Sequence, residues 1–148
     1  MSYQSAAGYA GDLLATDAYE LLAREPRATL IDARTQPEWV YVGAPDLRSL
    51  GKSVLFLEWQ SFPSMQVDPH FAARLGVMLE GAGAPRDAPL LFLCRSGGRS
   101  RQAAIAMTGA GRGPCFNVAD GFEGPLDATG RRNILGGWKA GGLPWTQT

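Results

Sequence analysis

The sequence predicts an α/β fold with a central, mostly parallel sheet that is flanked by helices on both faces. Short apolar runs alternate along the chain with segments of helical periodicity, and short turns join them. Residues 90–93 are apolar at every position, which is typical of a strand buried on both faces of a parallel sheet. The 148 residues suffice for one hydrophobic core, so we expect one domain over residues 1–148.

In the N-terminal half, two predicted helices alternate with two predicted strands. Thr16 or Asp17 can cap the first helix, and Pro37 suits the first position of the second. The expected order is a helix to about residue 24, a strand over residues 28–33, a short helix from Pro37 and a strand over residues 53–56.

A loop rich in apolar side chains comes before the C-terminal half. It covers residues 57–67 and contains Trp59, Phe62 and Met65, which either line the entrance to a site or cover the core. The remaining elements are a helix over residues 68–80, the strand over residues 90–93, a helix that includes residues 102–107, a strand over residues 116–118 and a glycine-rich, irregular tail over residues 121–148.

The most informative segment links the buried strand to the next helix and carries Cys94. Gly97 and Gly98 permit positive φ angles, so successive backbone N–H groups can point at one place. The N-terminus of the following helix adds the positive end of its dipole. Both features stabilise an anion, which makes Cys94 the candidate nucleophile.

Three arginines lie close to this cysteine in the sequence. Arg95, Arg99 and Arg101 occupy a stretch of seven residues. Such a cluster can be the solvated start of a helix, but the adjacent cysteine and glycines favour an anion-binding loop. Arginines next to a helix N-terminus favour the reactive thiolate form of a cysteine.

The composition excludes several classes of partner. Fourteen basic residues balance fourteen acidic ones, so no net charge attracts nucleic acid or an anionic membrane. The N-terminus lacks the pattern of a signal peptide, and no run approaches the roughly 18 apolar residues of a membrane span. We therefore expect a soluble, cytoplasmic protein with free thiols. Cys115 is expected to be buried and inert, and a single histidine, His70, argues against a metal site.

Four segments of the chain resemble the signatures of single-domain rhodaneses, a family of sulfurtransferases, in the family's order. Residues 30–34 and 37–39 resemble the first signature, an apolar strand that ends in Asp-x-Arg before a Pro-Glu-aromatic helix. Residues 94–100 are similar to the active-site loop. Residues 117–122 and 142–145 resemble the closing signatures.

The chain departs from the family pattern after the first signature. The family usually carries Gly-His-Ile there, whereas residues 42–47 read Val-Gly-Ala-Pro-Asp-Leu. The missing histidine is generally structural, so we expect a difference in loop packing rather than in chemistry.

The resemblance implies a rhodanese-like fold and a thiosulfate sulfurtransferase that needs no cofactor. Cys94 would attack the outer sulfur of thiosulfate or a similar donor, release sulfite and keep the sulfur as a persulfide. A thiophilic acceptor would then take the sulfur. That acceptor is cyanide, a thiol or a sulfur-accepting protein.

The same resemblance gives roles to the residues around Cys94. The donor and the persulfide would be bound by the backbone and side chains of Arg95, Ser96, Gly97, Gly98, Arg99 and Ser100. Within this set, the Arg99 guanidinium would hold the donor's oxyanion through paired hydrogen bonds. Ser100 would place its hydroxyl near the sulfur.

Two residues of the first signature would support this loop. Asp32 would brace the loop through Arg99, and Arg34 would add positive potential at the mouth of the site. Asp32 can alternatively be a turn-forming aspartate at the end of a strand.

Two other functions use parts of the same pattern. Cysteine phosphatases also close an anion-binding loop with an arginine, but their loop is one residue longer than the four residues between Cys94 and Arg99. A histidine commonly precedes the phosphatase cysteine, whereas Leu93 stands here. Rhodanese-like domains that have lost the cysteine serve as binding modules, but this chain retains it. A persulfide carrier that delivers sulfur to a protein partner would use Cys94 unchanged.

Overall fold

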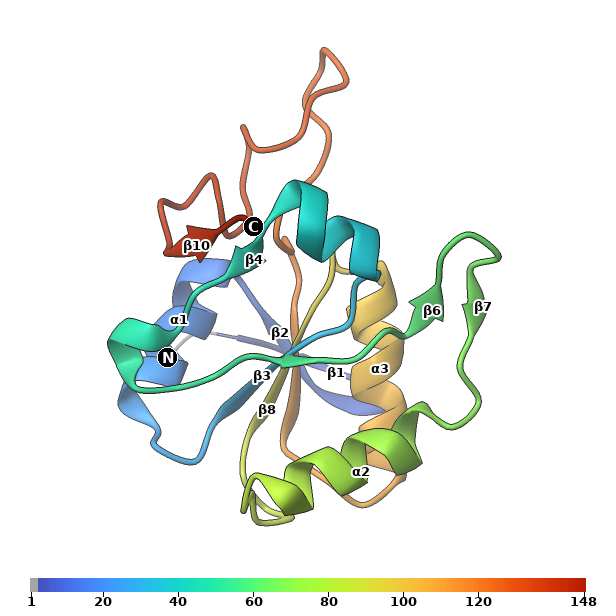
Figure 1. The fold of residues 1–148 in the computed structure, drawn as a ribbon. Helices are drawn as coiled ribbons and strands as arrows, with labels where there is room; N and C mark the ends of the chain where they lie inside the picture. The colour runs from blue at the N-terminus through green and yellow to red at the C-terminus, as the bar shows by residue number, and fades with distance from the viewer. Residues whose placement is uncertain (1–2) are drawn as a thin grey trace.

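In the computed structural model, which describes residues 3–148, six strands form a twisted sheet with the order β1-β2-β9-β8-β3-β5 (Figure 1). β1 and β2 are antiparallel, and every other neighbouring pair in this sheet is parallel. The strands are β1 (Gln4–Ala6), β2 (Tyr9–Leu13), β3 (Thr29–Asp32), β5 (Leu55–Phe56), β8 (Leu90–Leu93) and β9 (Cys115–Val118). The predicted α/β fold with a mostly parallel sheet is confirmed.

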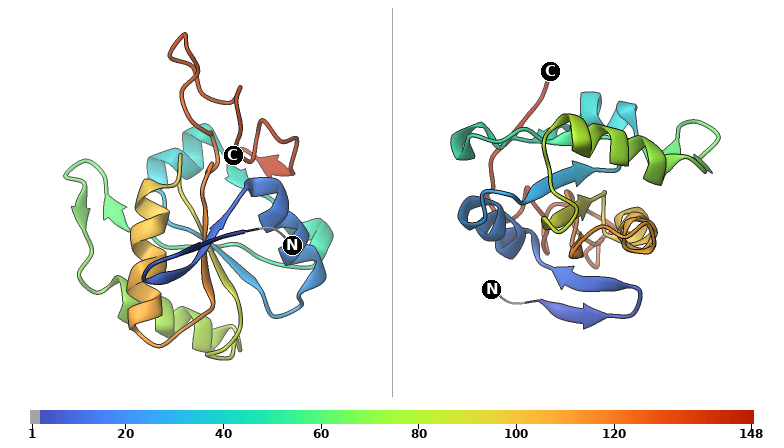
Figure 2. Two further views of the ribbon diagram at one scale, coloured as in Figure 1. Left: turned by 180° about the vertical axis from the view of Figure 1, so that it is seen from behind. Right: turned by 90° about the horizontal axis from the view of Figure 1, so that it is seen from below.

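Three α-helices cover the two faces of the sheet. α1 (Ala15–Arg24) lies on one face, and α2 (Phe71–Gly81) and α3 (Gly98–Gly109) lie on the other (Figures 1 and 2). β8 contributes to both hydrophobic clusters, because Leu91 and Leu93 point to the α1 side while Leu90 and Phe92 pack with α2 and α3. Its fully apolar sequence is therefore explained by burial on both faces.

Shorter elements connect and flank the sheet. Residues Glu38–Val42 form a π-helical turn and residues Arg48–Leu50 a 3₁₀ turn. β4 (Ala44–Pro45) pairs with β10 (Trp145–Thr146), which ties the C-terminal tail to the first half of the chain. β6 (Gln60–Ser61) and β7 (Gln66–Val67) form a hairpin where the sequence predicted a loop.

The N-terminal hairpin β1-β2 was also missing from the sequence-based prediction. Its strands consist largely of small and polar residues, so the alternation of burial along β2 is hidden in the sequence. β2 is held in place by its parallel partner β9, far away in the chain. Pairing with a distant strand overrode the weak local preference.

The cap of α1 differs from the expected one. Thr16 and Asp17 lie within the helix, which begins at Ala15, and Leu14 precedes it without a side-chain cap. The backbone N–H of Ala15 instead donates to Oδ1 of Asp120 at 2.8 Å. The carboxylate that binds this helix N-terminus therefore comes from the segment after β9. Across residues 3–148, none of the helices has the length and hydropathy to cross a membrane.

Candidate active site

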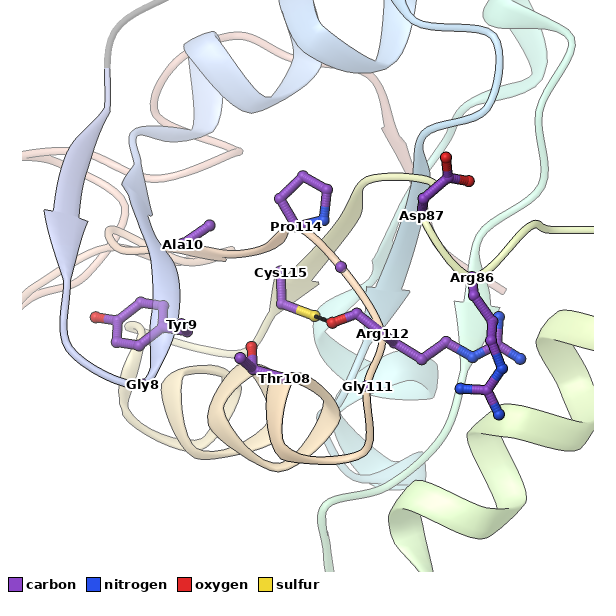
Figure 3. Close-up of a pocket in the computed structure, with 11 residues that line it drawn as sticks. Gly8, Tyr9, Ala10, Arg86, Asp87, Thr108, Gly111, Arg112, Pro114 and Cys115 are labelled. Carbon is purple, nitrogen blue, oxygen red and sulfur yellow. Dashed lines mark hydrogen bonds between the residues drawn. The ribbon is translucent and has the colours of Figure 1, made fainter.

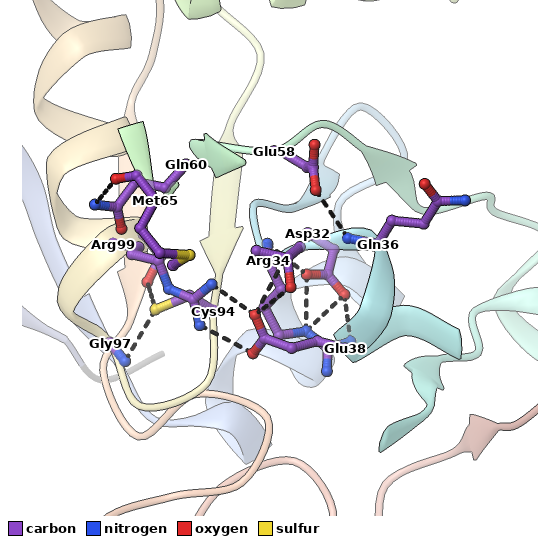
Figure 4. Close-up of polar contacts among 12 residues, drawn as sticks. Asp32, Arg34, Gln36, Glu38, Glu58, Gln60, Met65, Cys94, Gly97 and Arg99 are labelled. Atoms are coloured by element: carbon purple, nitrogen blue, oxygen red, sulfur yellow. Dashed lines mark hydrogen bonds and ion pairs between the residues drawn. The ribbon is translucent and has the colours of Figure 1, made fainter. Parts of the chain in front are cut away.

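Cys94 follows directly after the C-terminal end of β8, at the edge of the sheet where α3 begins. Its Sγ accepts a hydrogen bond from the backbone N–H of Gly97 at 3.2 Å and lies 3.1 Å from the hydroxyl of Ser100 (Figure 4). The residue is buried, with 1% of its surface exposed. The sulfur therefore lies inside the turn, among groups that can donate to a negative charge.

The shape of this turn depends on Gly97. Gly97 has φ +105°, and a Cβ atom there would clash with the carbonyl oxygen of Ala119. Gly98 has no positive φ angle and begins α3 with open space around it, so of the two glycines that permit a positive φ only Gly97 adopts one. The segment after β9 holds the turn, because the N–H of Phe122 donates to the carbonyl of Cys94 at 2.8 Å.

A chain of buried hydrogen bonds runs from Cys94 into the sheet. The Ser100 hydroxyl lies 2.6 Å from Oδ1 of Asn117, in the middle of β9. The Asn117 amide donates to Oδ1 of Asp12 at 3.0 Å and to the carbonyl of Gly97 at 3.1 Å. These two acceptors fix the orientation of the amide, so Oδ1 faces Ser100. Asn117 was not among the predicted site residues, although a polar residue in an otherwise apolar, buried strand was a usable signal.

Arg99 forms a paired ion bridge with Glu38 across the rim of the site (Figure 4). Nη1 and Nη2 lie 2.7 Å from Oε1 and 2.9 Å from Oε2, and the two side chains are 16% and 19% exposed. Burial opposes ionisation of Glu38, but the hydrogen bonds and charge of Arg99, with bonds from Thr35, lower its pKa from 4.5 to about 2. Burial likewise opposes the charge of Arg99, but Glu38 raises its pKa. Both groups are therefore charged at neutral pH.

A cavity of about 550 Å³ adjoins the active-site loop. One part of its wall is apolar and includes Phe62 and Met65 from the β6–β7 hairpin. Glu38, Arg95 and Arg99 provide the charged part of the wall. Trp59 instead packs edge-on against Phe71 in the core. Of the two interpretations of this segment, Phe62 and Met65 therefore line a cavity, and Trp59 covers the core.

A model of the rhodanese-like domain matches residues 14–127, which include Cys94, its turn and both members of the Arg99–Glu38 pair. The chain belongs to the rhodanese-like family. Its sequence is 37% identical over 134 residues to the uncharacterized protein RC0915 of Rickettsia conorii, covering 90% of this chain and 95% of that protein.

Solved structures have the same rhodanese fold. The crystal structure of Rv0390 from M. tuberculosis is similar with a TM-score of 0.83 and 47% identity, covering 95% of this chain and 99% of that one. The solution structure of a polysulfide-sulfur transferase homodimer from Wolinella succinogenes has a TM-score of 0.55 at 23% identity, covering 93% and 78% of the two chains. The latter likeness concerns the fold alone.

In this rhodanese-like domain, Asp32 and Arg34 do not occupy the expected places. They form a fully buried pair, with Nη2 of Arg34 2.7 Å from Oδ2 of Asp32. Arg34 also donates to the carbonyl of Gly43 at 2.8 Å and stacks on the ring of Phe122 at 4.2 Å. Asp32 therefore braces Arg34 rather than Arg99, and Arg34 is buried rather than at the mouth. The positions of Asp32 and Glu38 in the sequence could not show which of the two carboxylates binds Arg99.

The second cysteine of the rhodanese-like domain, drawn in Figure 3, lies at the start of β9, whereas Cys94 follows the end of the parallel strand β8. Cys115 begins β9 and is buried, and its thiol donates to the carbonyl of Arg112 at 3.4 Å. Burial raises its pKa to about 11, despite an opposing hydrogen bond from Thr108. The thiol is therefore protonated at neutral pH, and Cys115 is buried as expected.

The described part of the rhodanese-like domain, residues 3–148, contains no group of three or more His, Cys, Asp and Glu side chains arranged for a metal ion. His70 is exposed at the start of α2, and its backbone N–H donates to Asp68 at 2.8 Å.

Proposed function

We propose that this rhodanese-like domain is a sulfurtransferase that carries sulfane sulfur as a persulfide on Cys94. The supporting observation is the position of its sulfur, which is bound by the N–H of Gly97 and lies beside the hydroxyl of Ser100 at the start of α3. Such an environment stabilises negative charge on a thiolate or on a terminal persulfide sulfur. Membership of the rhodanese-like family supports the same reaction.

The reaction has two steps. In the first, the Cys94 thiolate attacks the outer sulfur of a donor such as thiosulfate, a new S–S bond forms, and the bond to the sulfite sulfur breaks with its electron pair leaving on sulfite. In the second, cyanide or an acceptor thiolate attacks the outer persulfide sulfur, and the electron pair returns to Cys94. Atoms and charge balance without a cofactor or an external base.

The residues of the active-site loop have different roles in this reaction. The backbone from Arg95 to Arg99 surrounds the transferred sulfur, with the N–H of Gly97 already at hydrogen-bond distance from Sγ. The Ser100 hydroxyl shares its proton between Asn117 and the sulfur, and it turns to the sulfur when the sulfur is charged. Arg95 supplies positive charge at the entrance, whereas the charge of Arg99 is balanced by Glu38.

A phosphatase is a weaker candidate on this geometry. Arginine in such enzymes binds the equatorial oxygens of a phosphate dianion, whereas both terminal nitrogens of Arg99 are bound to Glu38. A phosphate would meet the negative charge of Glu38 at the same place. A persulfide carrier that serves a protein acceptor differs from the proposed enzyme only in the second step.

Intact mass spectrometry tests the first step. The protein is incubated with thiosulfate or with inorganic polysulfide, and we expect a gain of one sulfur atom that cyanide removes as thiocyanate. The gain should be lost in Cys94→Ala and retained in the matched variant Cys115→Ala. A mass gain on Cys94 without catalytic turnover of thiosulfate and cyanide to thiocyanate would indicate the carrier. Retention of the gain in Cys94→Ala, or absence of any gain in the unaltered protein, would contradict the proposal.

A further inference from the structure

The cavity that Arg95 and Arg99 of the active-site loop line has little attraction for a small dianion. Arg99 lines the cavity, but its two terminal nitrogens are bound to Glu38, whose carboxylate belongs to the same wall. The pair is neutral overall, and its oxygen atoms repel a second negative charge. Because Glu38 already occupies both terminal nitrogens, Arg99 is poorly available to bind thiosulfate through paired hydrogen bonds. Thiosulfate carries two negative charges, so the Glu38 carboxylate also repels it.

One cation of the cavity is free to bind an anion. Arg95 is exposed and lines the cavity, and its side chain has no hydrogen-bond or ion-pair partner within residues 3–148. The net charge offered to a ligand is therefore close to +1. This balance favours a ligand with one negative charge over a ligand with two.

Apart from Thr35 and Gln60, the remaining wall is largely apolar, and the cavity is far larger than thiosulfate needs. Phe62 is 62% exposed and Met65 is 38% exposed, although both are large apolar side chains. Met65 has φ +56°, a backbone conformation that is uncommon outside glycine, and its side chain points from the hairpin toward Arg99 (Figure 4). A volume of about 550 Å³ is in the range of cavities that bind organic molecules.

We propose that the preferred sulfur donor of this site is a singly charged organic sulfane compound, whose apolar body contacts Phe62 and Met65 while its anionic head meets Arg95. This inference rests on the proposed function of Cys94. The thiosulfonates R–SO₂–S⁻ have this chemistry. The Cys94 thiolate attacks their outer sulfur, the S–S bond breaks, and the electron pair leaves on the sulfinate R–SO₂⁻.

Three donors separate the effect of charge from that of the apolar body. Thiosulfate and methanethiosulfonate share the reactive S–S bond but differ in charge. Methanethiosulfonate and benzenethiosulfonate share the charge but differ in the apolar body. The rate of persulfide formation on Cys94, measured by mass at several donor concentrations, gives a specificity constant for each donor.

Variants of the apolar wall test whether Phe62 and Met65 contact the apolar body of the donor. Phe62→Ala and Met65→Ala should each lower the ratio of specificity constants, benzenethiosulfonate over methanethiosulfonate, by about tenfold, which corresponds to about 1.4 kcal/mol. The control is Val77→Ala, which removes an exposed apolar side chain from α2 that does not line this cavity. The ratio should be unchanged in the control. Because each variant is judged by a ratio, a partial loss of folded protein does not affect the result.

Glu38→Gln tests whether the Glu38 carboxylate disfavours a donor with two negative charges. Removal of the carboxylate should raise the ratio of specificity constants, thiosulfate over methanethiosulfonate, severalfold. An unchanged ratio in Glu38→Gln, or equal ratios in Phe62→Ala and the unaltered protein, would overturn the inference.

Binding of the leaving group tests the cavity without turnover. Benzenesulfinate should bind to Cys94→Ala with a Kd that rises about tenfold when Phe62→Ala is added, and sulfite should bind more weakly than benzenesulfinate. If benzenesulfinate binds in this way but no donor loads Cys94, the assigned sulfurtransferase fails while the ligand class of the cavity stands. If Cys94 loads from polysulfide and benzenesulfinate does not bind, the sulfurtransferase stands and the donor class is wrong.

Discussion

The guanidinium of Arg99 is held by the carboxylate of Glu38, 61 residues earlier in the chain, through hydrogen bonds of 2.7 and 2.9 Å. This pair connects the π-helical turn after β3 to the first turn of α3, next to Cys94. It therefore affects both the stability of the fold and the charge of the site.

The Glu38–Arg99 pair should make stability dependent on pH in the acid range. The folded state lowers the pKa of Glu38 from 4.5 to about 2, so the pair stabilises the protein fully above pH 4.5. Its contribution is lost as the pH falls toward 2. We expect Glu38→Gln to lower the free energy of unfolding at pH 7 by roughly 2–3 kcal/mol, and the difference to shrink between pH 4.5 and 2.

Urea denaturation at a series of pH values measures this difference. The control is Glu20→Gln, which removes an exposed glutamate 3.7 Å from Arg24 on the surface of α1. It should have little effect at any pH. A difference for Glu38→Gln that stays constant from pH 7 to pH 2 would disprove the linkage.

The two glycines of the active-site turn should respond differently to alanine. Gly97→Ala forces a side chain into a conformation with φ +105° and against Ala119, so we expect a marked fall in Tm and loss of persulfide formation. Gly98→Ala places a good helix former in open space at the start of α3 and should leave Tm unchanged or higher. Equal effects of the two substitutions on Tm would contradict the described turn.

The buried pair of Asp32 and Arg34 should be essential to folding. Asp32→Asn leaves the Arg34 guanidinium charged and without its counter-ion at 0% exposure, which we expect to cost about 3–5 kcal/mol of unfolding free energy. The matched control is Asp46→Asn, which breaks a similarly short pair with Arg48 whose arginine is 83% exposed. Chemical denaturation should show a large loss for the first variant and little for the second, and similar losses would refute the assignment.

The distant cap of α1 should contribute measurably to stability. Asp120 accepts hydrogen bonds from the N–H groups of Ala15 at 2.8 Å and Gly137 at 2.9 Å. Asp120→Ala should therefore lower the free energy of unfolding by about 1–2 kcal/mol. Asp17→Ala removes the residue that the sequence suggested as a cap and should have a smaller effect. If Asp17→Ala lowered stability more than Asp120→Ala in thermal or urea denaturation, the result would contradict the distant cap and favour the local one.

The sequence by itself determined the features that depend on short-range patterns. The apolar run of β8, the cysteine after it and the glycine at position 97 specify a buried strand, a turn and a helix start, because each rests on neighbouring residues and local backbone preference. The same patterns in a known order carried the resemblance to the rhodanese family, which the match over residues 14–127 confirmed.

Only the tertiary structure decided which charged and polar groups meet. Arg99 pairs with Glu38 rather than Asp32, Asp120 caps α1, and Asn117 orients Ser100. The physical reason is that hydrogen bonds and ion pairs act over about 3 Å, so their partners are set by how distant elements pack rather than by separation along the chain. Local periodicity contains no information on that packing, and the partners of the active-site loop therefore had to come from the fold.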